Sequence, residues 1–232
     1  MQLFNTNNIQ KNYAYFGEEE TKHCTKTLRK GIGAILTLTD GKGNLYEAEL
    51  VAFDKKSTTL HIIKQLPSPD QRPFKLHIGI APTKNNSRLE WFLEKATELG
   101  IDEVSFLRCQ RSERKNIRLD RLEKIVLSAA KQSIKTIFPT LHPLRSFKEV
   151  IADAEADFKG IAHCNTVPLP PLKEKVTAVP SIFLLIGPEG DFSPQEVAWA
   201  QEQGFEEISL GQSRLRTETA GLVACHTVHL LH

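Results

Sequence analysis

The feature that most constrains this chain is an unbroken apolar run at residues 182–186, Ile-Phe-Leu-Leu-Ile, which ends at Gly187 and Pro188. A strand with one face in water would alternate apolar with polar residues. A run without polar positions is typical of a strand buried on both faces of a parallel sheet. Glycine and proline then stop the strand. The loop that follows should therefore open at the carboxyl end of a strand inside the sheet.

A helix start is encoded directly after this loop. Ser193 is a preferred N-cap residue, and Pro194 suits the first helical position. Glu196 has the spacing from Ser193 that a reciprocal capping box requires. Gly204 predicts where the helix ends. Strand, loop and helix are therefore all specified by local sequence.

A second strand and loop of the same kind lie near the carboxyl terminus. Residues 208–210 predict a short strand that ends at Gly211, and a terminal helix can begin at Thr217 or Thr219. Loops after parallel strands open at one edge of the sheet, where α/β proteins bind ligands. Glycine turns after strands are common, so spacing alone leaves a ligand site and a plain turn equally open. The charged residues of the two loops favour a site: Glu189, Asp191, Arg214, Arg216 and Glu218.

Length and composition bound the class of protein. With 232 residues and 40% hydrophobic content, the chain can form two modest globular domains. Its net charge is only +2, so nucleic-acid binding would need local clusters of charge. The 4 cysteines form no C-x-x-C pair, which argues against a zinc site and a disulfide framework and fits a reducing cytoplasm. We expect no export signal, because the first residues lack a basic region followed by an apolar core, and no apolar run approaches the ~20 residues of a membrane span. We expect a cytoplasmic protein without a metal site or a membrane segment.

The first part of the chain has the pattern of a small β-rich module. Alternating stretches at residues 34–39 and 46–53 flank Asp40-Gly-Lys-Gly-Asn44, a glycine-rich hairpin signal. Residues 58–64 predict a third strand. The module therefore contains a hairpin with at least one further strand.

A linker separates this module from the rest, because residues 67–73 contain three prolines. We place the boundary there, with one domain at residues 1–70 and the other at residues 71–232. Beyond the linker, strand and helix patterns alternate, which predicts a largely parallel sheet covered on both faces. The expected strands are residues 75–81, 104–107 and 160–163, and the expected helices are residues 88–99, 119–133 and 147–154.

Several common motifs are missing from the sequence. The glycine pairs within residues 31–33 and 41–43 lack the third glycine and the following helix of a dinucleotide site. There is no P-loop lysine motif, no Ser-His-Asp order and no H-E-x-x-H. A Rossmann-type nucleotide site and the commoner hydrolases are therefore disfavoured.

Two clusters of basic residues and one histidine have two interpretations each. Each cluster is either a solvated, salt-bridged face or a surface that contacts RNA phosphates. His163 ends a predicted strand at the edge expected for Gly187 and Gly211, although a lone histidine is more often structural. The clusters consist of Lys22, Lys26 and Arg29 before the first strands, and of Arg111, Arg114 and Arg118 after residue 107.

The two carboxy-terminal loops match the pattern of a known family. Residues 187–190, Gly-Pro-Glu-Gly, are followed by Phe192, and residues 214–220 read Arg-Leu-Arg-Thr-Glu-Thr-Ala. Together with residues 95–100 and 129–139, these stretches resemble the RsmE family of ribosomal RNA uridine-N3 methyltransferases, which belongs to the SPOUT superfamily.

The sequence departs from the family pattern at two positions. Asp191 stands where the family usually has a third glycine, and Lys135 stands where it usually has arginine. The first departure bears on the shape of the loop. The second keeps a positive charge but loses a bidentate donor.

The resemblance implies a fold, an activity and an assembly. The fold is α/β: a SPOUT-type parallel sheet with a carboxy-terminal trefoil knot, preceded by a small PUA-like β-barrel that binds RNA. The activity is methylation of uridine N3 in small-subunit (16S) ribosomal RNA, with S-adenosyl-L-methionine as the cofactor. The expected partners are this RNA, in an assembled particle, and a second copy of the chain in a homodimer. The alternative is a noncatalytic RNA-binding module that has lost the cofactor.

For the methyl transfer we choose Arg216, because a guanidinium offers several fixed donors to the charge that develops on the base. The alternative is an ion pair of Arg216 with Glu218 or Glu189 that only holds the loop. Glu218 is expected to act as a base or to orient Arg216. By resemblance, RNA contacts fall on the two basic clusters. The residues expected to bind the cofactor are His163, Ile186, Gly187, Glu189, Gly190, Leu210, Gly211, Arg214 and Leu215.

Overall fold

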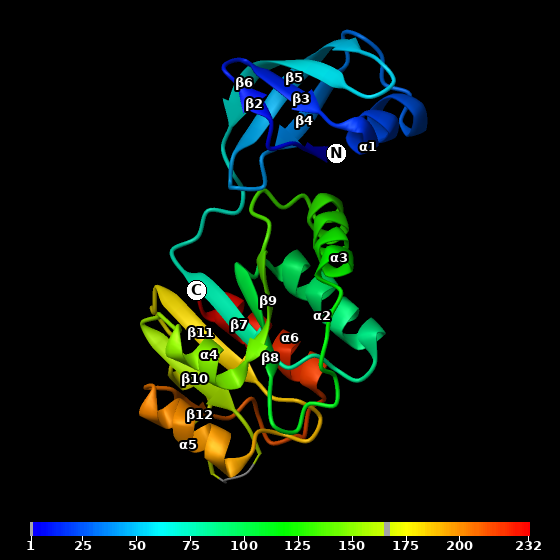
Figure 1. The fold of residues 1–232 in the computed structure, drawn as a ribbon. Helices are drawn as coiled ribbons and strands as arrows, with labels where there is room; N and C mark the ends of the chain where they lie inside the picture. The colour runs from blue at the N-terminus through cyan, green and yellow to red at the C-terminus, as the bar shows by residue number, and fades with distance from the viewer. Residues whose placement is uncertain (1, 165–167) are drawn as a thin grey trace. The chain divides into compact units, whose positions relative to one another are not determined.

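The computed structural model describes residues 2–164 and 168–232. Its chain forms two units, one built from residues 1–71 and 127–138 and the other from residues 72–126 and 139–232 (Figure 1). The second segment of the first unit is a difference from the sequence analysis, which assigned residues 127–138 to the later domain.

The first unit contains a six-stranded sheet in the order β1-β4-β5-β6-β3-β2. Its outermost strands, β1 and β2, are consecutive in the chain, and Thr6 lies between them. The N–H of Thr6 donates to the Thr39 carbonyl at 3.0 Å, while its hydroxyl donates to the Tyr15 carbonyl. The strands are β1 Leu3–Asn5, β2 Ile9–Gln10, β3 Tyr13–Phe16, β4 Ile35–Thr39, β5 Leu45–Phe53 and β6 Thr58–Leu66.

The predicted hairpin between β4 and β5 is confirmed. Asp40 accepts hydrogen bonds from the N–H groups of Lys42 and Asn44, at 2.8 and 3.2 Å. Gly41 and Gly43 have φ values of 74° and 99°, which explains why this turn needs glycine. The short strands β1 to β3 escaped prediction, as did the helical turns α1 Glu18–Lys22 and η1 His23–Thr27.

Backbone bonds to this hairpin explain why residues 127–138 belong to the first unit. Phe138 N–H donates to the Gly41 carbonyl, and Gly43 N–H donates to the Thr136 carbonyl, both at 2.9 Å. Asp70 adds an anchor at the end of the linker, since it accepts from the hydroxyl of Thr136 and forms an ion pair with Lys135 at 3.2 Å. Lys135, one of the two departures from the family pattern, therefore serves this anchor.

The second unit contains the parallel sheet that the alternating pattern predicts. Its order is β12-β10-β11-β7-β8-β9, and every pairing is parallel. The edge strand β9 escaped prediction because Pro143 and polar residues interrupt its apolar pattern. The strands are β7 Lys75–Ile80, β8 Glu103–Arg108, β9 Thr140–Ser146, β10 Phe158–Ala162, β11 Ser181–Ile186 and β12 Glu206–Ile208.

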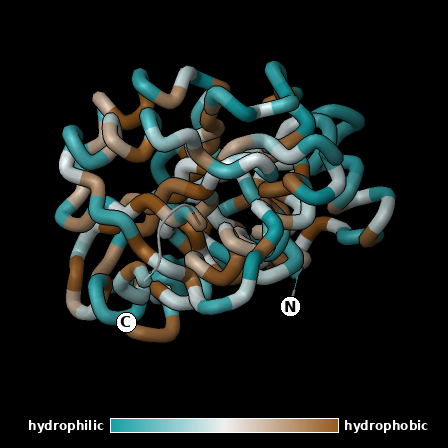
Figure 2. Tube along the Cα trace, turned by 90° about the horizontal axis from the view of Figure 1, so that it is seen from below, coloured by the Kyte–Doolittle hydropathy of each residue, from teal (hydrophilic) through white to brown (hydrophobic). Residues whose placement is uncertain are grey.

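Strand β11 is buried on both faces, as its sequence predicts. Ile182, Leu184 and Ile186 pack in one apolar cluster, with residues of α2 and α6. Phe183 and Leu185 pack in a second cluster, with residues of α4 and α5. Figure 2 colours the chain by hydropathy, and hydrophobic stretches alternate with hydrophilic ones along it. The helices are α2 Asn86–Leu99, α3 Leu119–Gln132, α4 Phe147–Ala152, α5 Pro194–Glu202 and α6 Thr217–Leu231, and a 3-10 turn, η2, covers Leu172–Glu174.

The sheet order determines where the loops after these strands lie. Strands β12, β10 and β11 are neighbours and run in the same direction, so the loops after all three open at one edge of the sheet. No helix in the described part of the chain is long and apolar enough to cross a bilayer.

The Asp70 anchor predicts a pH-dependent stability. Burial favours the neutral acid, but hydrogen bonds from Thr136 and the charge of Lys135 outweigh it and hold the pKa of Asp70 below its ordinary value. A lowered folded pKa stabilises the protein above the unfolded pKa of about 3.9, and this stabilisation is lost as the pH falls through the folded value. Asp70→Asn should therefore cost about 1–2 kcal/mol near neutral pH and almost nothing in strong acid, where Asp70 itself is neutral.

Urea unfolding followed by circular dichroism, at a series of pH values, measures this difference. Asp120→Asn is the control, because the Asp120 side chain is 65% exposed in its pair with Arg118 and should contribute little. A difference between Asp70→Asn and the wild type that does not change with pH would contradict the assignment.

Candidate functional site

A cavity of about 300 Å³ lies at the carboxyl ends of β10, β11 and β12. Its wall combines residues 162–164 at the end of β10, residues 186–189 and 191 at the end of β11, and residues 208–211 and 213–217 at the end of β12. This is the edge at which parallel α/β sheets bind ligands. The volume falls at the small end of the range of protein pockets that hold small molecules.

The structure brings the predicted cofactor residues together at this cavity, with one exception. Gly190 lies on an adjoining hollow, which it shares with Arg111 and Gln212. Arg216, the predicted catalytic residue, also lines the cavity, whereas Glu218 does not. The predicted cofactor residues on the wall are His163, Ile186, Gly187, Glu189, Leu210, Gly211, Arg214 and Leu215.

The structure explains how Asp191 can stand where the family usually has a third glycine. Its φ is 64°, in the left-handed region where glycine is preferred and aspartate is tolerated. The N–H of Asp191 donates to the Pro188 carbonyl at 2.9 Å and closes a tight turn. Its carboxylate accepts from the N–H groups of Phe192 and Cys164, at 2.8 and 2.9 Å. The aspartate thus adopts the backbone conformation of a glycine and adds a connection to the loop after β10.

Two more acidic side chains tie this loop region to neighbouring loops. Glu189 accepts from the N–H of Lys84, after β7, at 2.9 Å. Glu196 accepts from the N–H of Gln110, after β8, at 2.7 Å. Glu196 also completes the predicted capping box with Ser193, since each accepts a backbone N–H of the other. The carboxylates around β11 therefore hold the loops at this edge together.

The loop after β12 depends on Gly211, whose φ is 127°. A Cβ placed on Gly211 would meet no atom within 4 Å, so the backbone conformation and not crowding requires glycine. Thr217 then begins α6, and its hydroxyl donates to the Gly187 carbonyl at 3.0 Å. This bond joins the start of the terminal helix to the loop after β11.

The two predicted catalytic residues have different surroundings. Arg216 is the exposed N-cap residue of α6, and within residues 2–164 and 168–232 it forms no ion pair with Glu218 or Glu189. Glu218 is buried, and its nearest ionic partner is Arg88 of α2, with 3.7 Å between Oε1 and Nε. A base at the reacting centre would need to reach the cavity, so this placement does not fit the role of proton acceptor that was expected for Glu218.

His163 has both of the roles that the sequence left open: it is a buried structural residue, and it lies on the cavity wall. Its side chain is fully buried, and Nε2 lies 2.9 Å from Oε1 of Glu207 on β12. The residue nevertheless forms part of the cavity wall. It therefore packs between β10 and β12 and forms part of the cavity wall.

The basic residues after β8 are partly structural. Arg111 donates to the Gly190 carbonyl at 3.0 Å, and Arg114 donates to the carbonyls of Thr83 and Lys84. Of these three arginines, Arg118 is the one that pairs with a side chain and not with the backbone: it donates to the carboxylate of Asp120 at 3.1 Å. Arg111 and Arg114 thus hold the loops beside the cavity, in addition to the RNA contact that was predicted for them.

The amino-terminal basic cluster lies in the first unit, on α1 and the residues after it. Lys22, Lys26 and Arg29 are all exposed. Lys22 forms an ion pair with Glu18 within α1, at 2.6 Å. Exposure leaves the charges of Lys26 and Arg29 available to a polyanion.

The cavity wall also contains Cys164, Ser209 and Ser213, which were not predicted from the sequence. Ser209 and Gly211 bond to each other in both directions, each at 3.1 Å, which shapes the turn after β12. Cys164 is exposed and directly follows His163, so its place at a strand end was a usable signal. Small polar residues such as the two serines carry no comparable signal.

Two family models match the chain. A model described as an RNA methyltransferase domain covers residues 70–229, and a model of an RNA methyltransferase PUA domain covers residues 16–63. The chain belongs to the RNA methyltransferase family. The longer match includes all three loops of the cavity, and the shorter one lies in the first unit.

Relatives and solved structures agree with this RNA methyltransferase assignment. A probable rRNA methyltransferase from Porphyromonas gingivalis is 41% identical, with a TM-score of 0.90, over 100% of this chain and 98% of that one. A ribosomal RNA small subunit methyltransferase E from Neisseria gonorrhoeae, solved with bound S-adenosyl methionine, is 26% identical with a TM-score of 0.89, over 100% and 98%. The protein of the same name from Buchnera aphidicola is 28% identical over 96% of this chain and 90% of its own length. The resemblance to the RsmE family is confirmed.

Proposed function

We propose that this RNA methyltransferase transfers the methyl group of S-adenosyl-L-methionine to N3 of a uridine in small-subunit ribosomal RNA. The observation that carries the proposal is the cavity at the carboxyl ends of β10, β11 and β12, which gathers the two family loops. The relative from Neisseria gonorrhoeae, which aligns over the full length of this chain, binds the same cofactor.

The cavity wall fits such a cofactor in shape and in donor set. The missing Cβ of Gly211 leaves open space beside the backbone, so a ligand can approach the main chain there. Apolar residues such as Ile186, Leu210 and Leu215 supply a surface for an adenine ring, and polar backbone lies next to them. The cofactor-binding residues proposed are the cavity-lining set given above, with Gly190 acting through the adjoining loop.

When bound, the cofactor supplies an electrophilic methyl group on a positively charged sulfur. The chain itself must position the base and stabilise the charge that appears on it as N3 loses its proton. Arg216 suits this role, because it lines the cavity, is exposed and has donors for uracil O2 or O4. Glu218 supports it indirectly, since its carboxylate pairs with Arg88 and fixes the first turn of α6, which carries Arg216.

The proposal includes a carboxy-terminal trefoil knot. Strand β12 lies at the edge of the sheet, yet α6 returns to pack with α2 and beside β7 and β11. On the way, Thr217 bonds to the carbonyl of Gly187, in the loop after β11. A trefoil knot requires in addition that the terminal segment thread through a loop formed earlier in the chain, and the family resemblance motivates that part of the proposal.

We further propose that the protein acts as a homodimer on an assembled small-subunit particle in the cytoplasm. The family resemblance motivates these points, and the exposure of residues 211–214 leaves that side of the cavity accessible to a second copy. Light scattering at micromolar concentration measures the assembly state directly. A monomer would remove the dimer from the proposal and leave the cofactor site intact.

For the RNA contacts, we expect Arg118→Ala to weaken binding and to lower the salt dependence by about one counterion, because Arg118 only contributes charge. Arg111→Ala should also weaken cofactor binding, since Arg111 supports the loop at Gly190. Filter binding over a range of salt concentrations, combined with cofactor calorimetry, separates the two effects. Lys55→Ala, in the turn between β5 and β6, is the control. An unchanged salt slope in Arg118→Ala would make this residue part of a solvated face.

For the cofactor, we expect Gly211→Ala to weaken S-adenosyl-L-methionine binding at least about tenfold, because an L-residue at this φ is strained by about 1–3 kcal/mol. Calorimetry on the purified chain measures the affinity. Gly31→Ala is a matched control, since its Cβ also meets nothing within 4 Å and its φ is ordinary. Unchanged affinity in the folded Gly211→Ala variant would remove Gly211 from the site. A wild-type chain that binds no cofactor would favour the noncatalytic RNA-binding alternative.

For the chemistry, we expect Arg216→Lys to lower the single-turnover methylation rate by about 10²-fold or more, with little change in cofactor affinity, because lysine lacks the planar fork of donors. The substrate is the small ribosomal subunit, and the product is read by mass spectrometry of the RNA. Arg214→Lys, on the same wall, is the comparison and should act mainly on cofactor affinity. A near-normal rate in Arg216→Lys would refute the catalytic role, and lost cofactor binding would favour a loop-fixing role.

A further inference from the structure

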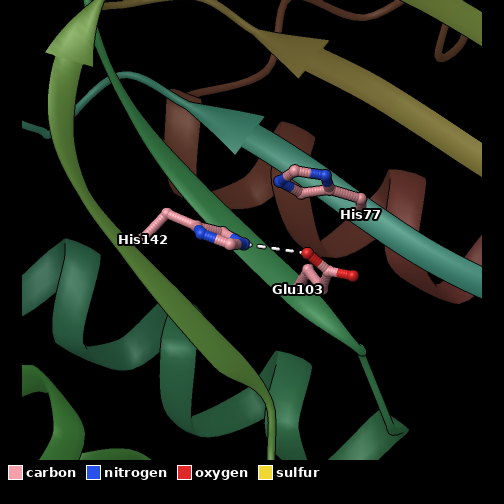
Figure 3. A group of neighbouring side chains, drawn as sticks. All are labelled: His77, Glu103 and His142. Atoms are coloured by element: carbon pink, nitrogen blue, oxygen red, sulfur yellow. Dashed lines mark hydrogen bonds and ion pairs between the residues drawn. The ribbon is translucent and has the colours of Figure 1, made fainter. Parts of the chain in front are cut away.

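A cluster of His77, Glu103 and His142 lies at the opposite end of the sheet from the cavity. The residues come from the three neighbouring strands β7, β8 and β9, within the first half of each. In the sheet register His77 pairs with Glu103, and Ser105 pairs with His142. Parallel pairing therefore places all three side chains on one face, where Figure 3 shows them turned toward one another.

The distances within this cluster are short enough for a shared ligand. One donor atom from each residue lies within 4.8 Å of the others. Nε2 of His142 is 2.8 Å from Oε2 of Glu103, the contact drawn in Figure 3. The three residues are half-buried, so an ion from solution can reach them. An adjoining hollow of about 350 Å³ leaves room for water at an open coordination position.

Contacts around the cluster hold His77 in a single orientation. Its ring stacks on Phe183 with centroids 3.9 Å apart and planes 4° from parallel. Its Nε2 lies 2.8 Å from the hydroxyl of Ser105. Metal-binding histidines are commonly fixed by outer contacts of this kind.

We propose that His77, Glu103 and His142 bind a divalent transition-metal ion. Two imidazoles and one carboxylate form a donor set that zinc and neighbouring first-row metals accept, with the remaining positions filled by water. The two arginines near the cluster pair with other carboxylates, so the carboxylate of Glu103 stays available to an ion. Arg145 pairs with Asp153 at 2.6 Å, and Asp102 pairs with Arg72 at 2.6 Å.

The ion would link β7, β8 and β9, the three strands at one side of the sheet, of which β9 is the edge strand. Strand β9 is the last in the sheet order, and its pairing with β8 shifts register between Ser105 and Leu107. An ion bound only by the folded protein stabilises the fold by mass action. We therefore assign the site a stabilising role, independent of the methyl transfer at the other end of the sheet.

The cysteines have no zinc-site spacing, so the sequence predicted no metal site. Histidine and carboxylate donors from three separate strands have no short motif either. Only the sheet register brings them together, so this donor set is visible in the structure alone.

Calorimetry with Zn²⁺ on the chelator-treated full chain tests the proposal. The expected result is one ion per chain with micromolar or tighter affinity and a melting temperature raised by several degrees. His142→Gln, which keeps a hydrogen-bond donor for Glu103, should bind at least about tenfold more weakly and lose the thermal shift. His77→Ala and Glu103→Gln should do the same. His226→Gln, an exposed histidine on α6, is the matched control and should bind as the wild type does.

Co²⁺ absorption distinguishes this site from a cysteine site. Binding at His77, Glu103 and His142 should give ligand-field bands without intense thiolate-to-metal charge transfer, because these donors are nitrogen and oxygen. A thiolate band would place the ion at a cysteine such as Cys164 and overturn the proposal. Equal affinity of the wild type and the folded His142→Gln variant would also overturn it, as would an affinity weaker than millimolar.

Discussion

The structure depends on the burial of β11 on both faces. Its five-residue apolar core, residues 182–186, contributes alternate side chains to the two apolar clusters that flank the sheet. A strand in this position has no face for polar residues, so the chain can place polar groups only where the strand ends. The Gly187 loop is that end, and its position beside the ends of β10 and β12 follows from parallel pairing. The apolar run thus determines where ligand chemistry is possible.

Acidic side chains then hold the exposed edge in shape. Glu189, Asp191 and Glu196 each accept a backbone N–H from a different loop, after β7, β10 and β8 respectively. Charge-assisted bonds to backbone groups are stronger than neutral ones. The charged residues that suggested a binding site in the sequence therefore include several whose first role is to connect loops. Arg111 and Arg114 belong to the same network, since both donate to loop carbonyls.

Much of the fold could be predicted because it is encoded locally. The strand at β11, the capping box at Ser193 and the hairpin at residues 40–44 all rest on neighbours in sequence, and the structure contains each of them. The short strands β1 to β3 and the edge strand β9 are stabilised by pairing with distant segments and leave little local pattern. The attachment of residues 127–138 to the first unit has the same origin, because its backbone bonds reach Gly41 and Gly43.

The site shows the same division between local and distant causes. The glycine at position 211 is explained by its own φ, and the turn that needs it was predictable. The different surroundings of Arg216 and Glu218 could not be predicted from the sequence, because Glu218 pairs with Arg88, which lies far away along the chain. The resulting charge distribution is informative. On the cavity wall Glu189 and Asp191 bond to backbone N–H groups, whereas Arg214 and Arg216 are exposed and, in the described part of the chain, form no ion pair. Negative charge is thus held by the loops, and positive charge faces solvent. In the proposed reaction, an anionic RNA whose base loses its proton would meet these guanidinium groups, which within the described residues are not paired with a carboxylate, and they would stabilise the developing charge.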